Sequence, residues 1–336
     1  MDKYIVGVDI GGTLIRVAIS SAELDERSFK MKSIKTPKEH EYSIVNSVIL
    51  LISELLVEND INNEDVIGIG LASAGPLDIE KGEVFNNANL GFKVIPLKEP
   101  LEDRFPGIPI YLINDCNSAV LGIHYFEAEE FEKENLVYIT MSTGIGGGVI
   151  CNGHLLIGKD GNAAEVGHAI VEPHSDHQCN CGAYGCWETF SSGTGIKNRA
   201  LEALETTSLN SKILMFMVDN DPSRITTKEI FQAAKGADKF SKSIIEMSLY
   251  YNKIGVGLVN NFYDCTSVYF GGSLMRDKEL IIPPLVEQFK KEPLQFTINH
   301  PPNIKVTKYL DEIGVRGALV LVKYKLEGNP VICKGL

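Results

Sequence analysis

Residues 4–20 read YIVGVDIGGTLIRVAIS, and this stretch is the strongest indication of the fold class. Apolar residues dominate Tyr4–Ile10 and Leu14–Ser20, and the glycine pair between them is typical of a tight turn. The pattern therefore predicts two strands joined as a hairpin. Glycines let backbone N–H groups approach an anion closely, and Thr13 adds a hydroxyl donor. An aspartate at the end of the first strand, Asp9, would hold a metal-bound water beside that anion.

A second glycine turn repeats this design, and a third follows another apolar strand. The turn Ser142–Gly148 again joins two apolar stretches, and the turn Gly271–Ser273 follows another apolar stretch. Two such turns facing each other would clamp a phosphate, and the third would let an adenine or ribose lie against bare backbone. The turns at Gly11–Gly12 and Ser142–Gly148 match neither a Walker loop nor a dinucleotide fingerprint. A plain hairpin turn, with no ligand, remains the alternative interpretation. The expected nucleotide-binding residues are Asp9, Gly11, Gly12, Thr13, Thr143, Gly144, Gly271 and Gly272.

Strand and helix patterns alternate outward from the hairpin and predict an α/β protein. The pattern restarts after the acidic stretch Glu127–Glu134, which we take as the boundary between two lobes. The predicted helices are Tyr42–Glu58, Asn117–Phe126, Thr194–Glu205, Thr227–Ala234, Lys239–Phe262 and Asp311–Tyr324. The further strands are Val66–Ala72, Ile108–Ile113, Leu136–Met141, Gly146–Cys151, Ser267–Phe270 and Ile304–Lys308.

The composition excludes several function classes. The 336 residues carry 32 basic and 44 acidic side chains, a formal charge of −12, which disfavours nucleic acid as a partner. The stretch Ile44–Val57 is too short and too polar to span a bilayer, and the N-terminus shows no secretory signal. We therefore expect a cytoplasmic protein with no membrane partner.

Asn114 and Asp115 stand between a predicted strand and a predicted helix. Either residue type routinely caps a helix N-terminus. A carboxylate at the carboxyl end of a strand is also where α/β sheets bind ligands, and there it would act as a base toward a hydroxyl. These residues alone do not decide between a cap and a base.

The densest group of metal-ligand residue types is Cys179, Cys181 and Cys186. Tetrahedral Zn²⁺ needs a fourth ligand, for which His168, His174 and His177 compete. With four protein ligands the ion would be structural and would hold a loop in place. Glu165 and Glu188 flank that loop, so the ion would preorganise two carboxylates for hydrogen bonds to sugar-like hydroxyls.

Together these motifs resemble the ROK family of sugar kinases and sugar-responsive repressors. The resemblance rests on Asp9–Thr13, Asn114–Asp115, Ser142–Gly148, Glu165–His168 and Cys179–Glu188, and it spans nearly the whole chain in order. It implies an actin-like (ribonuclease H-like) two-lobe fold, with ATP, Mg²⁺ and a sugar bound in the cleft between lobes. The implied lobes are 1–126, completed by the helix 311–326, and 127–310 with the zinc loop.

The resemblance also implies residue roles. Asp115 matches the catalytic base, which accepts the proton of a hexose C6 hydroxyl. His168 has two roles, with one ring nitrogen on zinc and the other toward the sugar. The matched sugar-binding residues are Gly75, Asn89, Asn114, Asp115, Glu165, His168 and Glu188, and the matched zinc ligands are His168, Cys179, Cys181 and Cys186.

The expected activity is an ATP-dependent glucokinase or hexokinase. An N-acetylmannosamine or N-acetylglucosamine kinase is the first alternative, because such kinases share nearly all of these motifs. A sugar-responsive repressor is the second, and it is disfavoured because the first strand begins at Tyr4 with no helix-turn-helix ahead of it. The resemblance suggests a homodimer or homotetramer, and the region Leu209–Thr226 has no assigned role.

Overall fold

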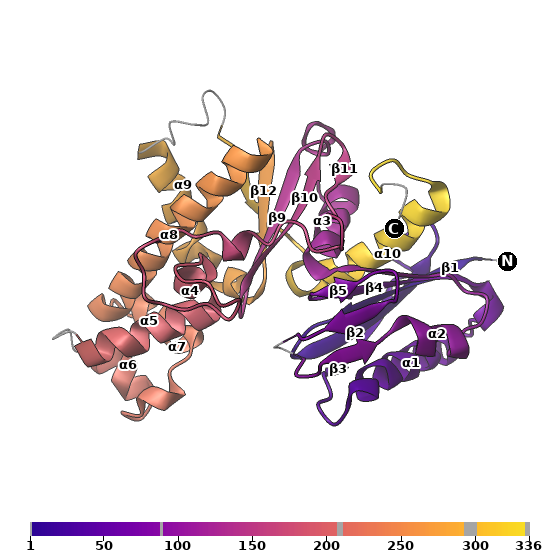
Figure 1. Cartoon of the computed structure of the whole chain (residues 1–336), viewed down its shortest axis with the longest axis horizontal. Helices are drawn as coiled ribbons and strands as arrows, with labels where there is room; N and C mark the ends of the chain where they lie inside the picture. The colour runs from indigo at the N-terminus through magenta and orange to yellow at the C-terminus, as the bar shows by residue number, and fades with distance from the viewer. Residues whose placement is uncertain (1, 88–89, 207–210, 292–300, 333–336) are drawn as a thin grey trace. The chain divides into compact units, whose positions relative to one another are not determined.

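The protein is described from a computed structural model that covers residues 2–87, 90–206, 211–291 and 301–332 (Figure 1). The chain divides into two compact units. Unit 1 comprises Met1–Tyr138, Gly148–Ala164 and Thr307–Leu336, and unit 2 comprises Ile139–Gly147 and Glu165–Val306. The domain bounds expected from the sequence stay a prediction.

Unit 1 is built on a five-stranded sheet with the order β3-β2-β1-β4-β8. Strands β1, β4 and β8 are parallel, whereas β2 and β3 continue the sheet as antiparallel neighbours. The parallel strands are largely buried, which explains their continuous apolar sequences. The bounds are β1 Tyr4–Ile10, β2 Leu14–Ser21, β3 Lys30–Lys35, β4 Val66–Ser73 and β8 Ile110–Asn114.

Helices cover both faces of this sheet (Figure 1). Helix α1, Glu41–Glu58, packs on β2 and β3, while α3, Asp115–Phe126, and α10, Ile313–Glu327, lie on the opposite face. Helix α10 crosses the sheet closely, because a Cβ at Gly70 would lie 2.1 Å from the carbonyl oxygen of Ala318. The remaining elements of unit 1 are β5 Leu77–Asp78, β6 Glu83–Phe85, β7 Val94–Pro96, α2 Lys98–Arg104 and β11 His154–Leu155.

A second five-stranded sheet has the order β11-β10-β9-β12-β13. The division between the units falls within β9, Leu136–Met141, and β10, Ile145–Cys151. Strands β12, Ser267–Gly271, and β13, Asn303–Val306, pair in parallel. The helices of unit 2 are α4 Glu188–Ser191, α5 Gly193–Thr206, α6 Lys212–Met217, α7 Thr227–Lys235, α8 Lys239–Tyr263 and α9 Ile282–Lys291.

The structure confirms the predicted hairpin and α/β alternation, and two helix starts differ from prediction by two residues. Helix α3 begins at Asp115 and not at Asn117, because the Asn114 side chain caps it. Helix α10 begins at Ile313 and not at Asp311, because residues Leu310–Glu312 form a 3-10 turn directly before it. Part of the region Leu209–Thr226 lies outside the described residues, and the described part contains α6.

Among the described helices, none combines the length and the apolar character that crossing a bilayer requires.

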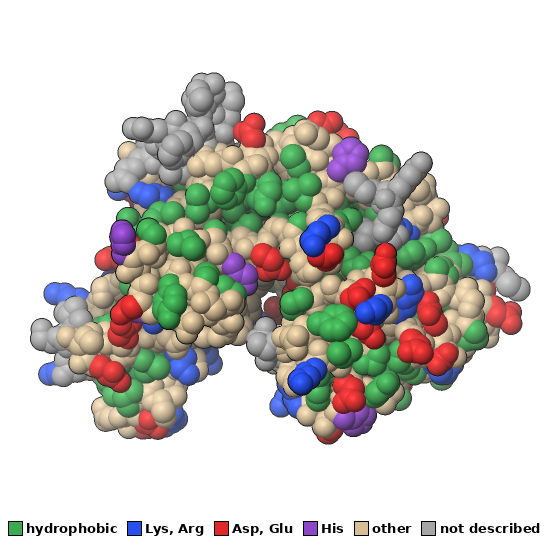
Figure 2. All heavy atoms as spheres, viewed as in Figure 1, with side chains coloured by type: hydrophobic (Ala, Val, Ile, Leu, Met, Phe, Trp, Pro, Cys, Tyr) green, Lys and Arg blue, Asp and Glu red, His purple; other side chains and the backbone are tan. Residues whose placement is uncertain are grey.

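On the face drawn in Figure 2, the Lys and Arg side chains are scattered among Asp and Glu side chains.

Candidate active site

Asp115 is the first residue of α3, at the carboxyl end of strand β8. Asn114, the helix cap, accepts the backbone N–H groups of Cys116 at 2.9 Å and Asn117 at 3.3 Å. The capping interpretation is therefore confirmed for Asn114, and it leaves Asp115 free for another role. The Cys116 N–H also donates to Asp115 Oδ1 at 2.8 Å. The cap thus fixes where the Asp115 carboxyl group stands.

Burial raises the pKa of Asp115, although hydrogen bonds from Cys116 oppose that shift. Desolvation disfavours the charged form of a carboxyl group, so the ionised group gains affinity for a proton. A base of raised pKa accepts a hydroxyl proton more readily than an ordinary surface carboxylate does. Asp115 therefore has the position and the environment of a general base.

Gly75 follows β4 and lies beside Asn114, since a Cβ at Gly75 would be 3.8 Å from Asn114 Nδ2. The same Cβ would be 2.9 Å from Asn162 Oδ1, which accepts the Leu77 N–H at 3.1 Å. The structure thus brings Gly75 close to Asn114 at the ends of neighbouring strands. The sequence analysis missed Asn162, which holds the segment after Gly75. The expected sugar contact Asn89 lies outside the described residues.

Asp9 stands near the end of β1, directly before the first glycine turn. Burial raises its pKa to about 6, and Arg16, whose guanidinium lies 3.3 Å from the carboxylate, opposes the shift. A Cβ at Gly314 would lie 3.0 Å from the Asp9 carboxyl carbon, so a larger residue there would press on the Asp9 side chain. The sequence analysis missed Arg16, although it is the cross-strand partner of Asp9 in the hairpin register.

Within unit 2, the second glycine turn contacts Glu188. The Ile145 N–H donates to Glu188 Oε2 at 3.3 Å, and a Cβ at Gly144 would lie 2.8 Å from that oxygen. The third turn is adjacent, because the hydroxyls of Ser142 and Ser273 are 3.1 Å apart. The positive φ of Gly272, 86°, belongs to this third turn, at the end of β12. The structure therefore gathers the expected nucleotide-binding residues of unit 2 around one corner.

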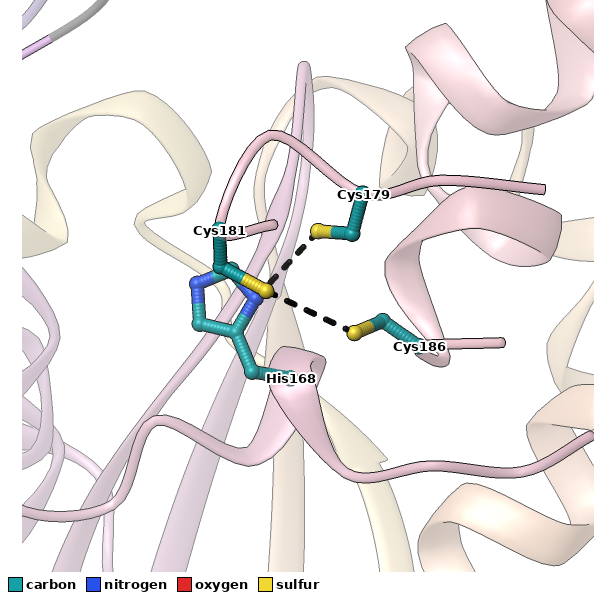
Figure 3. A group of neighbouring side chains, drawn as sticks. All are labelled: His168, Cys179, Cys181 and Cys186. Atoms are coloured by element: carbon teal, nitrogen blue, oxygen red, sulfur yellow. Dashed lines mark hydrogen bonds between the residues drawn. The ribbon is translucent and has the colours of Figure 1, made fainter. Parts of the chain in front are cut away.

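The cysteine cluster of unit 2 is drawn in Figure 3. The side chains of His168, Cys179, Cys181 and Cys186 point toward one another, and their ligand atoms all lie within 4.8 Å. His168 Nδ1 is 3.5 Å from the Cys179 sulfur, and the sulfurs of Cys181 and Cys186 are 3.7 Å apart. Neither His174 nor His177 belongs to this cluster of described residues.

The donor set suits Zn²⁺. Tetrahedral zinc with bonds of about 2.3 Å to sulfur separates two sulfurs by about 3.8 Å, close to the 3.7 Å between Cys181 and Cys186. Burial raises the pKa of the Cys186 thiol to about 11, so a thiolate at neutral pH needs the positive charge of a bound ion. The residues present therefore have the number, the spacing and the chemistry of a structural metal site.

The cluster adjoins both flanking glutamates. His168 Nε2 faces Glu165 at 4.0 Å, whereas Nδ1 lies 3.7 Å from Glu188 Oε1. The buried Trp187 anchors the segment, because its indole N–H donates to Asn252 of α8 at 2.8 Å. The structure thus brings together Glu165, His168 and Glu188, which the sequence predicts as sugar contacts.

The two sheets, the glycine turns at strand ends and the buried Asp115 carboxyl group at the start of α3 fit an actin-like α/β fold. The model of the ROK family matches residues 5–325, and the chain belongs to the ROK family. It is 30% identical over 326 residues to a glucokinase of Halalkalibacterium halodurans, with 96% of each chain covered.

A solved structure of another ROK family member is also similar to this chain. The crystal structure of a ROK family glucokinase from Streptomyces griseus in complex with glucose and AMPPNP superposes with a TM-score of 0.76 at 27% identity, covering 95% of this chain and 98% of that one. The DNA-binding transcriptional dual regulator NagC of Escherichia coli K12 is 25% identical, and the match covers 95% of this chain and 75% of the regulator.

Proposed function

We propose that this protein is an ATP-dependent hexokinase of the glucokinase type. The observation that carries the proposal is the carboxyl group of Asp115, held at the carboxyl end of β8 by the Asn114 cap, with a pKa raised by burial. Two glucokinases match this chain over nearly its whole length at 30% identity, whereas the regulator matches at 25%. A kinase is therefore favoured over a repressor.

In the proposed reaction the C6 hydroxyl oxygen of a hexose attacks the γ-phosphorus of ATP, the bond from that phosphorus to the bridging oxygen breaks to release ADP, and Asp115 accepts the hydroxyl proton. The base contributes orientation as much as basicity, because phosphoryl transfer passes through a loose transition state in which the proton leaves late. Mg²⁺ bound to ATP supplies positive charge to the transferring phosphoryl group. Asp9 would hold a water of that ion, and N–H groups of the glycine turns would bind phosphate oxygens.

The remaining residues would bind the sugar, the nucleoside and zinc. In unit 1, Gly75 and Asn114 would contact sugar hydroxyls, as would Asn89 outside the described residues. In unit 2, Glu165, His168 and Glu188 would do so, and Gly271 and Gly272 would border the nucleoside. Zn²⁺ bound by His168, Cys179, Cys181 and Cys186 would keep these side chains in place. Assembly into a homodimer or homotetramer belongs to the same proposal.

A substrate panel tests the proposal. Purified protein with ATP and Mg²⁺ is assayed for ADP release with glucose, mannose, N-acetylmannosamine, N-acetylglucosamine and fructose, and phosphorus NMR locates the phosphate on the product. We expect the highest kcat/KM with glucose and phosphorylation at C6. A preference for an N-acetylhexosamine would select the alternative kinase, and no turnover of any sugar by zinc-replete protein would refute the kinase assignment.

A further inference from the structure

We propose that Thr36 is a positioning residue that orients the peptide group between Gly11 and Gly12 for binding a nucleotide phosphate. This inference rests on the proposed function, in which the first glycine turn binds phosphate. The sequence analysis assigned no role to Thr36, which follows strand β3 and is 25 positions beyond Gly11 in the chain.

Thr36 makes two hydrogen bonds to the glycine turn. Its hydroxyl donates to the carbonyl oxygen of Gly11 at 2.6 Å, and its backbone N–H donates to the carbonyl oxygen of Thr13 at 3.0 Å. The turn itself is closed by the Gly11 N–H, which donates to the Leu14 carbonyl at 3.0 Å. Thr36 is only 7% exposed, so its hydroxyl is held in place by packing. Both carbonyl groups at the base of the turn are therefore satisfied by one residue.

Because the peptide bond is planar, the hydrogen bond from Thr36 to the Gly11 carbonyl also sets the direction of the Gly12 N–H. The carbonyl of Gly11 and the N–H of Gly12 belong to one planar trans peptide group, in which they point in opposite directions. When the Thr36 hydroxyl holds the carbonyl, the Gly12 N–H must point away from Thr36. Within the described ranges no protein group accepts that N–H, so it stays available for an anion.

Two consecutive glycines make such a restraint necessary. Glycine populates positive and negative φ about equally, so the peptide between Gly11 and Gly12 can flip at little steric cost. A flipped peptide would present a carbonyl oxygen where an N–H is needed, and that oxygen would repel a phosphate. Loss of the Thr36 hydroxyl would also leave a carbonyl without its partner, which favours the flip.

The test compares Thr36→Val, which keeps the branched shape and removes the hydroxyl, with Thr36→Ser, which keeps the hydroxyl. The readouts are the KM for ATP, the KM for glucose, and the Kd of ADP by calorimetry. We expect the valine variant to weaken ADP binding and raise the KM for ATP by about 3- to 10-fold, the factor for one neutral hydrogen bond. The KM for glucose should stay unchanged, and the serine variant should match the wild type.

Three results would overturn the inference: unchanged ADP binding in the valine variant, equal weakening in both variants, or a parallel rise in the KM for glucose. If the valine variant does not fold, Thr36→Ala replaces it in the comparison with serine. The ADP titration needs no sugar turnover. A protein whose ADP affinity depends on the Thr36 hydroxyl, but which phosphorylates no hexose, would therefore refute the proposed function and leave this inference standing.

Discussion

Replacement of Asp115 by Asn separates catalysis from binding and folding. The amide oxygen of Asn can still accept the Cys116 N–H that now lies 2.8 Å from Asp115 Oδ1, so the start of α3 should be preserved. The amide cannot take up the hydroxyl proton, and a positioned general base contributes about 10²- to 10⁴-fold to a rate. We expect kcat to fall by about 10³-fold, or about 4 kcal/mol of transition-state stabilisation.

Stability gives this prediction a second signature. Burial raises the pKa of Asp115, which means that its ionised form costs folding free energy at neutral pH. The uncharged amide introduced by Asp115→Asn avoids that cost, so the thermal midpoint should not fall. Steady-state assays with glucose and ATP, and thermal unfolding, measure both effects. Asp103→Asn, on the exposed face of α2, is the matched control.

A kcat within tenfold of the wild type would refute the role of Asp115 as a base. A large rise in the KM for glucose with little loss of kcat would show instead that Asp115 only binds the sugar. A lowered thermal midpoint would contradict the inference that the buried carboxylate is held at a cost.

Asp9→Asn should stabilise the protein by up to about 3 kcal/mol at pH 7, because the Asp9 pKa is raised from 3.8 to about 6 in the folded state. Between pH 3.8 and about 6, Asp9 is protonated in the folded state but ionised in the unfolded state. The stability gained by Asp9→Asn should therefore shrink as pH falls from 7 to 4, and urea unfolding at each pH measures it. Cys181→Ser should abolish bound zinc, seen by elemental analysis, and raise the KM for glucose about tenfold by loosening the ligand-bearing loop. Gly148→Ala should lower both stability and kcat, because its Cβ would lie 2.1 Å from the carbonyl oxygen of Cys116; overpacking of this kind costs about 1–3 kcal/mol in unfolding experiments.

Controls and contrary results are specific to each variant. A stability difference for Asp9→Asn that does not change with pH would show that its ionisation is not the cause. Cys151→Ser, outside the cysteine cluster, should retain zinc, and unchanged glucose kinetics in a zinc-free Cys181→Ser protein would contradict the role of the loop. Wild-type stability in Gly148→Ala would mean that β10 and α3 can separate without cost.

Local chemistry made much of this fold predictable. The hairpin Tyr4–Ser21 follows from two apolar stretches around a glycine pair, and the helix patterns follow from apolar spacing. Elements with weaker signals were not predicted. Three of the six residues of edge strand β3 are lysines, and helix α9 has two prolines next to its first residue, where a missing N–H does no harm.

The residue types of the site can be read from the chain alone: glycine turns at strand ends, an aspartate after a capping asparagine, and three cysteines with a histidine upstream. Their partners depend on tertiary packing, because pairs such as Ile145 with Glu188 and Gly11 with Thr36 are far apart in the chain. Turn and cap preferences act over a few residues and leave a signal in the sequence. A hydrogen bond between distant segments leaves none, since its geometry depends on how whole strands and helices pack. Tertiary packing likewise places His168, and neither His174 nor His177, beside the three cysteines among the described residues.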